Sequence, residues 1–207
     1  MKRIIASVMW ILIIVGAVFS YEGISSVVNS KKTPVDFNSL KAADLQKNMI
    51  VEGDIECNFG YFEEEYHTTY GIKTGQSIYN FLITVGEDKY MGLKNQTEAQ
   101  RITLEQQMND TLKSLEDNSI KPQVFHFKGQ IKEMTEEEIG FMKEYLSYMG
   151  YTEADIQQYM CTYYIQCVDY DGGMTKAGIG IALLLLGICG LVIPFIREYQ
   201  AEKQNMQ

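Results

Sequence analysis

Two long apolar stretches stand near the ends of the 207-residue chain, and the region between them alternates between apolar and polar positions. The first covers residues 4–20 and the second residues 177–196, and neither contains a charged side chain. At about 1.5 Å per residue, twenty helical residues cover roughly 30 Å, the thickness of the hydrocarbon core of a bilayer. The pattern therefore predicts a transmembrane helix at residues 177–196 and a second apolar helix at residues 1–20.

The first apolar segment has two interpretations. Two basic residues precede it and the small Ser20 closes it, as in a secretory signal peptide that is removed after export. The length of the apolar run, Trp10 in its middle and the bulky Phe19 beside the supposed cleavage position favour retention. We therefore expect residues 1–20 to form a transmembrane helix or an uncleaved signal anchor.

Between the apolar ends, the pattern divides the chain into a linker and one domain. Residues 21–37 have the Gly, Ser, Asn and Pro content of a linker, and residues 38–175 contain the periodic segments of a folded domain. Residues 197–207 form a short tail. The domain is long enough to bury a core of its own.

Within the domain, the period of the apolar positions predicts the elements. From Val51 to Tyr61, apolar residues alternate with mostly acidic ones, which predicts a long strand with one buried face. Further strands are expected at residues 77–85, 90–94, 124–132 and 160–170, and a short helix at residues 40–47. Longer helices begin after the capping residues Thr97, Thr135 and Thr152. The helix after Thr97 carries the apolar positions Leu104, Met108, Leu112 and Leu115.

This order of elements predicts an α+β fold flanked by two transmembrane helices. Three strands, a helix, a strand, two helices and a final strand match a small five-stranded barrel of the OB type with an added helical pair. The alternative is a small mixed sheet with added helices.

The charged residues limit the classes of binding partner and favour one orientation of the chain in the membrane. Residues 21–175 carry 25 acidic and 13 basic side chains. Such a surface repels phosphates, so nucleic acid is not expected as a partner. Basic residues on the outer flanks of both apolar stretches favour cytoplasmic termini. The sequence thus predicts a two-pass protein of the cell membrane, in contact with the lipid bilayer, with an extracytoplasmic domain.

The four cysteines do not form a disulfide framework. Cys189 lies in the second apolar stretch, which leaves Cys57, Cys161 and Cys167 in the domain. These three are interpreted as buried small apolar residues, or as one disulfide that joins Cys57 to Cys161 or Cys167.

Catalytic, cofactor and metal sites are not predicted. The run Glu63 to His67 offers carboxylates and an imidazole to a cation, but it is interpreted as a solvated loop. Glu52, Asp54 and Glu56 share one face of the first strand, which suits an acid-dependent hydrolase and equally suits any polar strand face. An enzyme is therefore the least favoured hypothesis.

Two other sets of residues are candidates for interaction. Small residues in the second apolar stretch leave room for another helix to pack closely. Tyrosines present a flat apolar ring with a polar tip, which suits sugars or peptides. The candidate helix-packing residues are Gly178, Gly187 and Gly190, and the candidate interaction surface is Tyr145, Tyr148, Tyr151 and Tyr159.

The pattern Leu-x4-Leu-x5-Val-x-Gly-x-Ile, from Leu40 to Ile55, resembles that of a family of uncharacterised small bacterial membrane proteins. The resemblance covers the whole chain and implies an N-terminal span, an extracytoplasmic domain and a C-terminal span. It implies no catalytic residues.

The hypothesis that best fits the sequence is a membrane-anchored extracytoplasmic module without enzymatic activity. It would bind a protein partner or serve as a subunit of a membrane complex. The alternative is a surface domain that binds a glycan or peptide of the cell wall.

Overall fold

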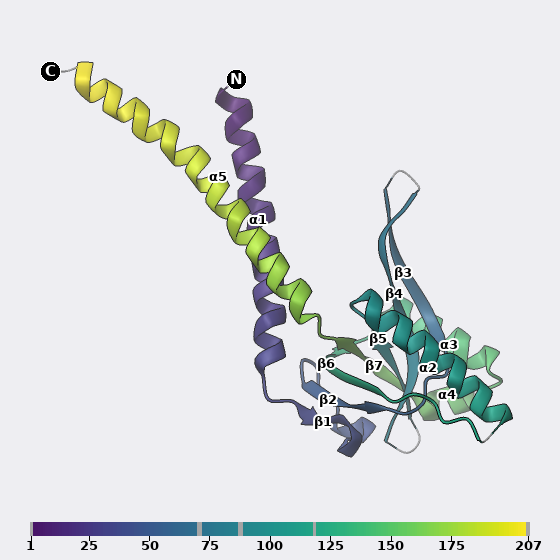
Figure 1. The fold of residues 1–207 in the computed structure, drawn as a ribbon. Helices are drawn as coiled ribbons and strands as arrows, with labels where there is room; N and C mark the ends of the chain where they lie inside the picture. The colour runs from purple at the N-terminus through teal and green to yellow at the C-terminus, as the bar shows by residue number, and fades with distance from the viewer. Residues whose placement is uncertain (1, 70–71, 87–88, 118, 206–207) are drawn as a thin grey trace. The chain divides into compact units, whose positions relative to one another are not determined.

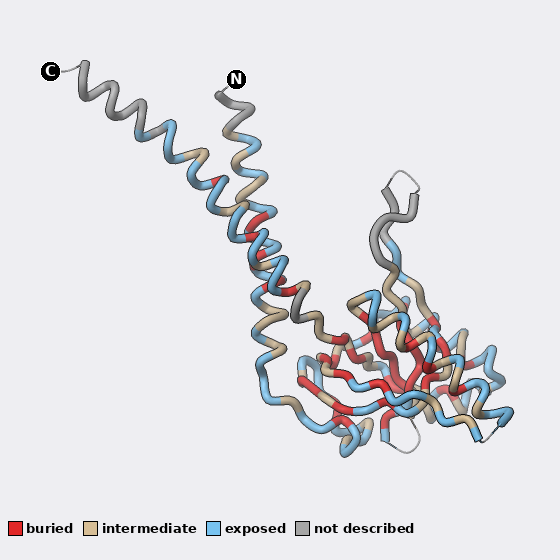
Figure 2. Tube along the Cα trace, viewed as in Figure 1, coloured by how far each residue is buried: buried red, intermediate tan, exposed pale blue. Residues whose placement is uncertain are grey.

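The computed structural model describes residues 2–69, 72–86, 89–117 and 119–205, and the chain forms two compact units (Figure 1). One unit contains the two chain ends, up to Lys31 and from Asp169 onward. The other is the domain of residues 32–168. The buried residues of the domain gather in its sheet (Figure 2).

The unit of the chain ends consists of two long antiparallel helices, α1 (Lys2–Lys31) and α5 (Tyr170–Asn205). Both contain windows long and apolar enough to cross a membrane, Ala6–Lys31 with mean hydropathy 2.0 and Gly172–Pro194 with mean hydropathy 2.5. α1 ends at Lys31, within the stretch 21–37 for which a linker is predicted. Each helix is thus longer than its apolar segment.

The domain is built on a seven-stranded sheet with the order β1-β2-β6-β7-β5-β4-β3. Two pairs, β1 with β2 and β5 with β7, are parallel, and the other neighbours are antiparallel. The strands are β1 (Val35–Asp36), β2 (Ile50–Ile55), β3 (Tyr61–Thr69), β4 (Ile72–Val85), β5 (Lys89–Lys94), β6 (Phe125–Glu133) and β7 (Met160–Cys167).

The predicted OB-like barrel is wrong, and the alternative of a mixed sheet is the correct class. A barrel closes when its edge strands pair, whereas β1 and β3 lie at opposite edges of this open sheet and pair with each other nowhere in the described residues. Helices cover both faces of the sheet, so it has no hollow interior. The sequence pattern shows strands and their faces but not which strands pair.

Helices lie on both sides of the sheet and divide its core into two clusters. α2 (Glu98–Glu116) packs Leu104 on one face, together with Phe37 from the 3-10 turn η1 (Phe37–Ser39) and Leu45, which follows the 3-10 turn η2 (Ala42–Asp44). α3 (Glu136–Tyr148) and α4 (Glu153–Tyr159) pack Met142, Leu146 and Ile156 on the other face. The two 3-10 turns stand where a short α-helix is expected.

The three predicted helix starts are confirmed. The hydroxyl groups of Thr97, Thr135 and Thr152 each accept a hydrogen bond from a backbone N–H in the first turn of the helix that follows. In each case the backbone N–H of the threonine donates a hydrogen bond to the side chain of the residue three positions on. These caps are local in sequence, which is why the pattern reveals them.

The apolar stripe predicted for α2 is correct only in part. Leu104 is fully buried, but Leu112 and Leu115 are 48% and 71% exposed. The buried face instead contains Gln107 and Thr111. These polar side chains are buried because they hydrogen-bond backbone groups of the sheet and its loops, with Gln107 Nε2 donating to the carbonyls of residues 55 and 123.

Candidate functional site

The strands place a lysine and two glutamates on the face of the sheet covered by α3, where a third glutamate, from α3 itself, meets them. Lys94 ends β5, and Glu138 stands in the first turn of α3. An irregularity in the β3–β4 register after Tyr61 turns Glu63 toward the same face, and Glu65 follows two residues on. We call these four residues the Lys94 cluster.

The ammonium group of Lys94 lies among the three carboxylates. Its Nζ is 2.6 Å from Glu65 Oε1, 2.8 Å from Glu138 Oε1 and 3.7 Å from Glu63 Oε2. It also lies 4.7 Å from the centroid of the Tyr164 ring. The side chains of Lys94, Glu63 and Glu138 are only 7%, 9% and 8% exposed, so these charges interact with little screening by water.

Burial and ion pairing have opposite effects on the pKa values of the side chains in the cluster. Burial raises the pKa of Glu63 above its usual value, although Lys94 and Asn80 oppose the shift. Burial also disfavours the ionised form of Glu138, but hydrogen bonds from Lys94 and Thr135 outweigh this effect and lower its pKa. Burial disfavours the charged form of Lys94 as well, yet its carboxylate partners raise its pKa. Lys94 therefore stays charged at neutral pH.

The cluster has the acidic side chains of a cation site but contains its own cation. One oxygen from each of Glu63, Glu65 and Glu138 lies within 4.8 Å of the others, a spacing that could hold a metal ion. The Lys94 ammonium supplies positive charge to the same oxygens. The arrangement acts as an ion-pair network that joins β3, β5 and α3.

The interpretation of Glu63 to His67 as a solvated loop is wrong for the residues described. These residues belong to β3, and the Glu63 side chain is buried. Glu64 points to the opposite face, where Tyr79 Oη donates a 3.0 Å hydrogen bond to it. The His67 side chain lies outside the described part of the chain.

The acidic face of β2 lies beside a histidine of β6. His126 Nδ1 is 2.8 Å from Asp54 Oδ1, and His126 Nε2 is 3.2 Å from Glu52 Oε1. The hydrogen bond with Asp54, followed by that with Glu52, raises the pKa of His126. The two carboxylates bind opposite ring nitrogens, so they do not converge with the imidazole on one point as metal ligands would.

The four candidate tyrosines differ in their exposure and in their contacts. The Tyr145 hydroxyl is turned into the fold and donates to the Phe59 carbonyl at 2.8 Å, whereas Tyr148 is 89% exposed. Tyr151 and Tyr159 pack edge to face with ring centroids 6.3 Å apart. Tyr151 also shares a 2.7 Å hydroxyl–hydroxyl hydrogen bond with Tyr90, so much of the set contributes to packing.

Glycines line the contact between α1 and α5 at a spacing of seven residues. Gly16 on α1 faces Gly180 on α5, and Gly23 faces Gly173, whereas Gly187 on α5 faces Ile13 and the backbone of Met9. A methyl group on Gly16 would lie 2.8 Å from the carbonyl oxygen of residue 180, and one on Gly187 would lie 2.9 Å from that of residue 9. This repeat is the one that keeps two helices in contact along a left-handed coil.

Two of the three candidate glycines face the other helix. Gly187 lies beside Ile13, and Gly190 lies beside Met9. Gly178 has no atom within 4 Å of the position that its side chain would take, so it lies away from α1. The candidate set does not include Gly16, Gly23, Gly173 or Gly180, although the seven-residue spacing on each helix is visible in the sequence.

The cysteines are all free thiols in the described structure. Cys161 and Cys167 are buried, and Cys57 is half-buried, so the interpretation as small apolar residues holds for the first two. Burial raises the pKa of Cys167 to about 12 and raises that of Cys57 as well. The pKa values of Cys57, Cys161 and Cys167 are all raised by burial, the opposite of the shift in a reactive thiol.

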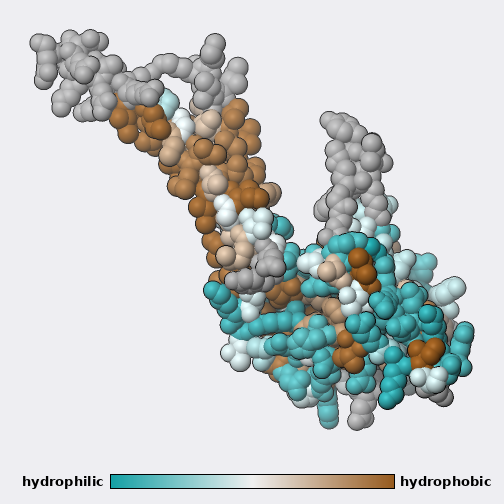
Figure 3. Space-filling view, in the orientation of Figure 1, coloured by the Kyte–Doolittle hydropathy of each residue, from teal (hydrophilic) through white to brown (hydrophobic). Residues whose placement is uncertain are grey.

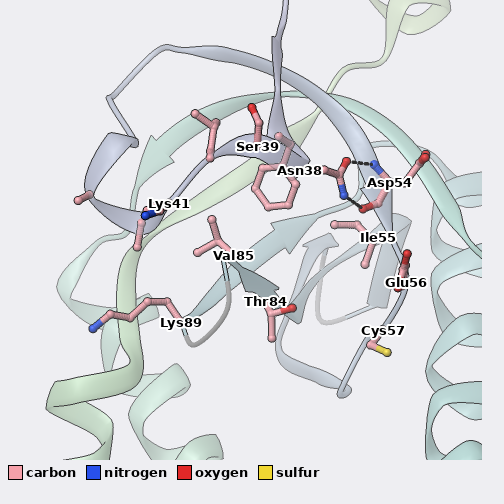
Figure 4. Close-up of a pocket in the computed structure, with 15 residues that line it drawn as sticks. Asn38, Ser39, Lys41, Asp54, Ile55, Glu56, Cys57, Thr84, Val85 and Lys89 are labelled. Atoms are coloured by element: carbon pink, nitrogen blue, oxygen red, sulfur yellow. Dashed lines mark hydrogen bonds between the residues drawn. The ribbon is translucent and has the colours of Figure 1, made fainter.

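A pocket of about 840 Å³ lies between residues 37–43 and the ends of β2 and β4 (Figure 4). Phe37, Ile55 and Val85 contribute apolar surface to it. Charged residues line its rim, namely Lys41, Asp54, Glu56 and Lys89. No sequence motif predicts this pocket, because η1, β2 and β4 come together only in the fold.

The chain thus consists of an α+β domain that is flanked in the sequence by two long apolar helices. The model of one family, described as a domain of unknown function (DUF8577), matches residues 1–196. The chain therefore belongs to this family, and the match includes both apolar helices as well as the domain. No curated protein matches the sequence.

Proposed function

We propose that this chain is a two-pass membrane protein whose central domain is an extracytoplasmic interaction module without enzymatic activity. The observation that carries the proposal is the pair of apolar helices. Their glycines face each other, while Trp10, Ile14, Leu185 and Leu186 are exposed by 57–62% in apolar stretches that suit lipid. The exposed apolar side chains cover the helix pair in Figure 3.

The side chains that would serve an acid-dependent hydrolase have structural partners. Glu63 and Glu65 surround Lys94, and Glu52 and Asp54 hold His126. These pairings support a binding role over a catalytic one. The basic residues on the outer flanks of the spans support cytoplasmic termini and an extracytoplasmic domain.

The orientation can be tested by labelling with a maleimide that does not cross membranes. In a variant without native cysteines, Tyr148→Cys places a thiol on an exposed position of the domain, and Lys203→Cys places one in the tail. In intact cells, we expect labelling of the first thiol only, and labelling of both after permeabilisation. Labelling of the tail alone in intact cells would overturn the proposed orientation.

A cell-wall glycan or peptide is the second candidate ligand. Tyr148 is the tyrosine of the candidate surface that solvent reaches most freely. A pull-down of the detergent-solubilised full chain with isolated peptidoglycan tests this candidate. Retention that Tyr148→Ala reduces and Tyr145→Phe does not would favour a tyrosine-dependent contact.

A further inference from the structure

One exposed side of α3 carries acidic and aromatic side chains in alternation. Glu137, Phe141, Glu144 and Tyr148 stand at positions i, i+4, i+7 and i+11, which share one face of an α-helix. We call these four residues the α3 stripe. All four are exposed, and the two rings are exposed by 38% at Phe141 and by 89% at Tyr148.

The α3 stripe is separate from the contacts that hold the helix on the sheet. Glu138, Met142 and Leu146 are the buried residues of α3, and they lie on a different side of the helix. The hydroxyl group of Thr135 caps the first turn. Because packing and capping already fix the helix, its exposed side chains stand on a rigid support, which lowers the entropic cost of binding.

The carboxylates of the α3 stripe are free to bind a partner. Within the described part of the chain, neither Glu137 nor Glu144 forms a hydrogen bond or an ion pair. Lys143 is the one basic residue of α3, and it follows Phe141 by two positions and precedes Glu144 by one. Residues at these spacings do not face each other on a helix, so the stripe has two negative charges and no positive one.

The two rings add a preference for one kind of cation. The face of an aromatic ring attracts a cation, and arginine more often than lysine. A planar guanidinium also binds a carboxylate through two parallel N–H groups, which an ammonium cannot do. Gly140, next to Phe141, has no atom within 4 Å of the position that its side chain would take. A partner can therefore approach the helix closely beside this ring.

We propose that the α3 stripe binds an arginine-rich segment of a protein partner. Guanidinium groups of the segment pair with Glu137 and Glu144 and stack on Phe141 and Tyr148. Charge complementarity supports this partner, because residues 21–175 carry 25 acidic and 13 basic side chains and attract a basic segment as a whole. An acidic partner is repelled, and a neutral glycan leaves the carboxylates unpaired. The proposal rests on the proposed function, since it names the kind of partner of the interaction module.

The test uses isothermal titration calorimetry of the purified full chain in micelles of a non-ionic detergent. The probe is hexa-arginine with both ends blocked, and hexa-lysine with the same ends is compared with it. We expect saturable binding that weakens as salt is raised from about 0.05 M to about 0.5 M. Hexa-arginine should bind about threefold more tightly than hexa-lysine. The absence of binding at millimolar hexa-arginine would overturn the proposal.

Charge variants locate the binding surface. Glu137→Gln/Glu144→Gln should weaken binding of hexa-arginine about fivefold. Asp110→Asn/Glu116→Gln removes two charges from α2, on the other face of the sheet, and is the matched control. This control should bind almost like the parent. Equal weakening in the two double variants would show attraction by the net charge alone and would refute the site.

Ring variants test the preference for arginine. Phe141→Ala/Tyr148→Ala should weaken hexa-arginine about fivefold and remove its advantage over hexa-lysine. Leu115→Ala, at a position of α2 that is 71% exposed, is the matched control and should bind like the parent. An unchanged preference in the ring variant would contradict the role of the rings. Maleimide labelling decides the membrane orientation separately, so a failure of the site is distinguishable from a failure of the proposed function.

Discussion

Lys94 Nζ donates a 2.8 Å hydrogen bond to Glu138 Oε1 and thereby joins the end of β5 to the first turn of α3. The other oxygen of Glu138 accepts from the backbone N–H of Thr135 at 2.6 Å. Glu138 therefore serves at once as the capping-box residue of α3 and as a partner of a buried lysine. The position of α3 on the sheet depends on both interactions.

Removal of the lysine charge should destabilise the domain strongly. Lys94→Met keeps the length of the side chain but leaves the carboxylates of Glu63 and Glu138 buried without their cation. We expect a loss of about 3 kcal/mol or more in the free energy of unfolding at neutral pH. Urea denaturation of the full chain in detergent micelles measures it.

Lys47→Met is the matched control for this change. Lys47 pairs with Glu133 at 2.6 Å, but the two side chains are 58% and 51% exposed. Water screens such an exposed pair, so we expect only a small loss of stability in this variant. Similar losses in the two variants would contradict the importance assigned to the buried cluster.

Glu63→Gln should change the dependence of stability on pH. Burial raises the pKa of Glu63, so the folded state favours its protonated form. Its contribution to stability is present below the usual pKa of a glutamate and is lost as pH rises through the raised pKa. The variant should gain stability relative to the parent between about pH 4 and pH 8. Melting temperatures across this interval test the sign, and a relative loss toward pH 8 would refute it.

His126→Gln should lower the stability of the domain in a pH-dependent way, with the largest effect below neutral pH. Asp54 and Glu52 raise the pKa of His126, so its protonated form stabilises the fold. This contribution is complete below the pKa of a free histidine and disappears as pH rises through the raised value. The difference in melting temperature between parent and variant should be largest at about pH 5.5 and close to zero at about pH 9. Because the imidazole is exposed, about 0.5 M salt should reduce the difference.

A large side chain in place of a contact glycine should separate α1 from α5. A side chain on Gly180 would lie 2.8 Å from the carbonyl oxygen of residue 16, whereas one on Gly178 would meet nothing within 4 Å. Gly180→Leu is therefore expected to disrupt the pair, and Gly178→Leu is its control. The effect is on the order of 1–3 kcal/mol.

Cross-linking measures the separation of the helices. Glu22 and Lys176 face each other across the two helices, with Lys176 Nζ 3.8 Å from Glu22 Oε2, so cysteines introduced there, in a chain without its native cysteines, should be joined by a short bis-maleimide cross-linker. We expect a high yield in the parent and in Gly178→Leu, and a low yield in Gly180→Leu. Equal yields in the two leucine variants would show that the glycine contact does not hold the pair together.

The features predicted correctly from the sequence depend on residues close together in the chain. Thr135 and Glu138 are three positions apart, so the pattern reveals their capping box. The partners of Lys94 come from β3 and α3, and nothing local indicates that Glu63 is buried. Gln107 faces the core because of hydrogen bonds to distant carbonyls, which an apolar stripe cannot show. Strand pairing also depends on residues far apart in the chain. The sequence pattern therefore predicts a barrel where the strands form an open sheet.

The position of β7 in the sheet also determines when the domain can be completed during synthesis. β7 is the last strand in the chain, yet it lies between β6 and β5 and is the strand through which β1-β2-β6 and β5-β4-β3 are joined in the described sheet. Until residue 167 has left the ribosome, the nascent chain holds two half-sheets with open inner edges. Such edges are prone to mispairing, so the growing chain needs protection until its final strand arrives.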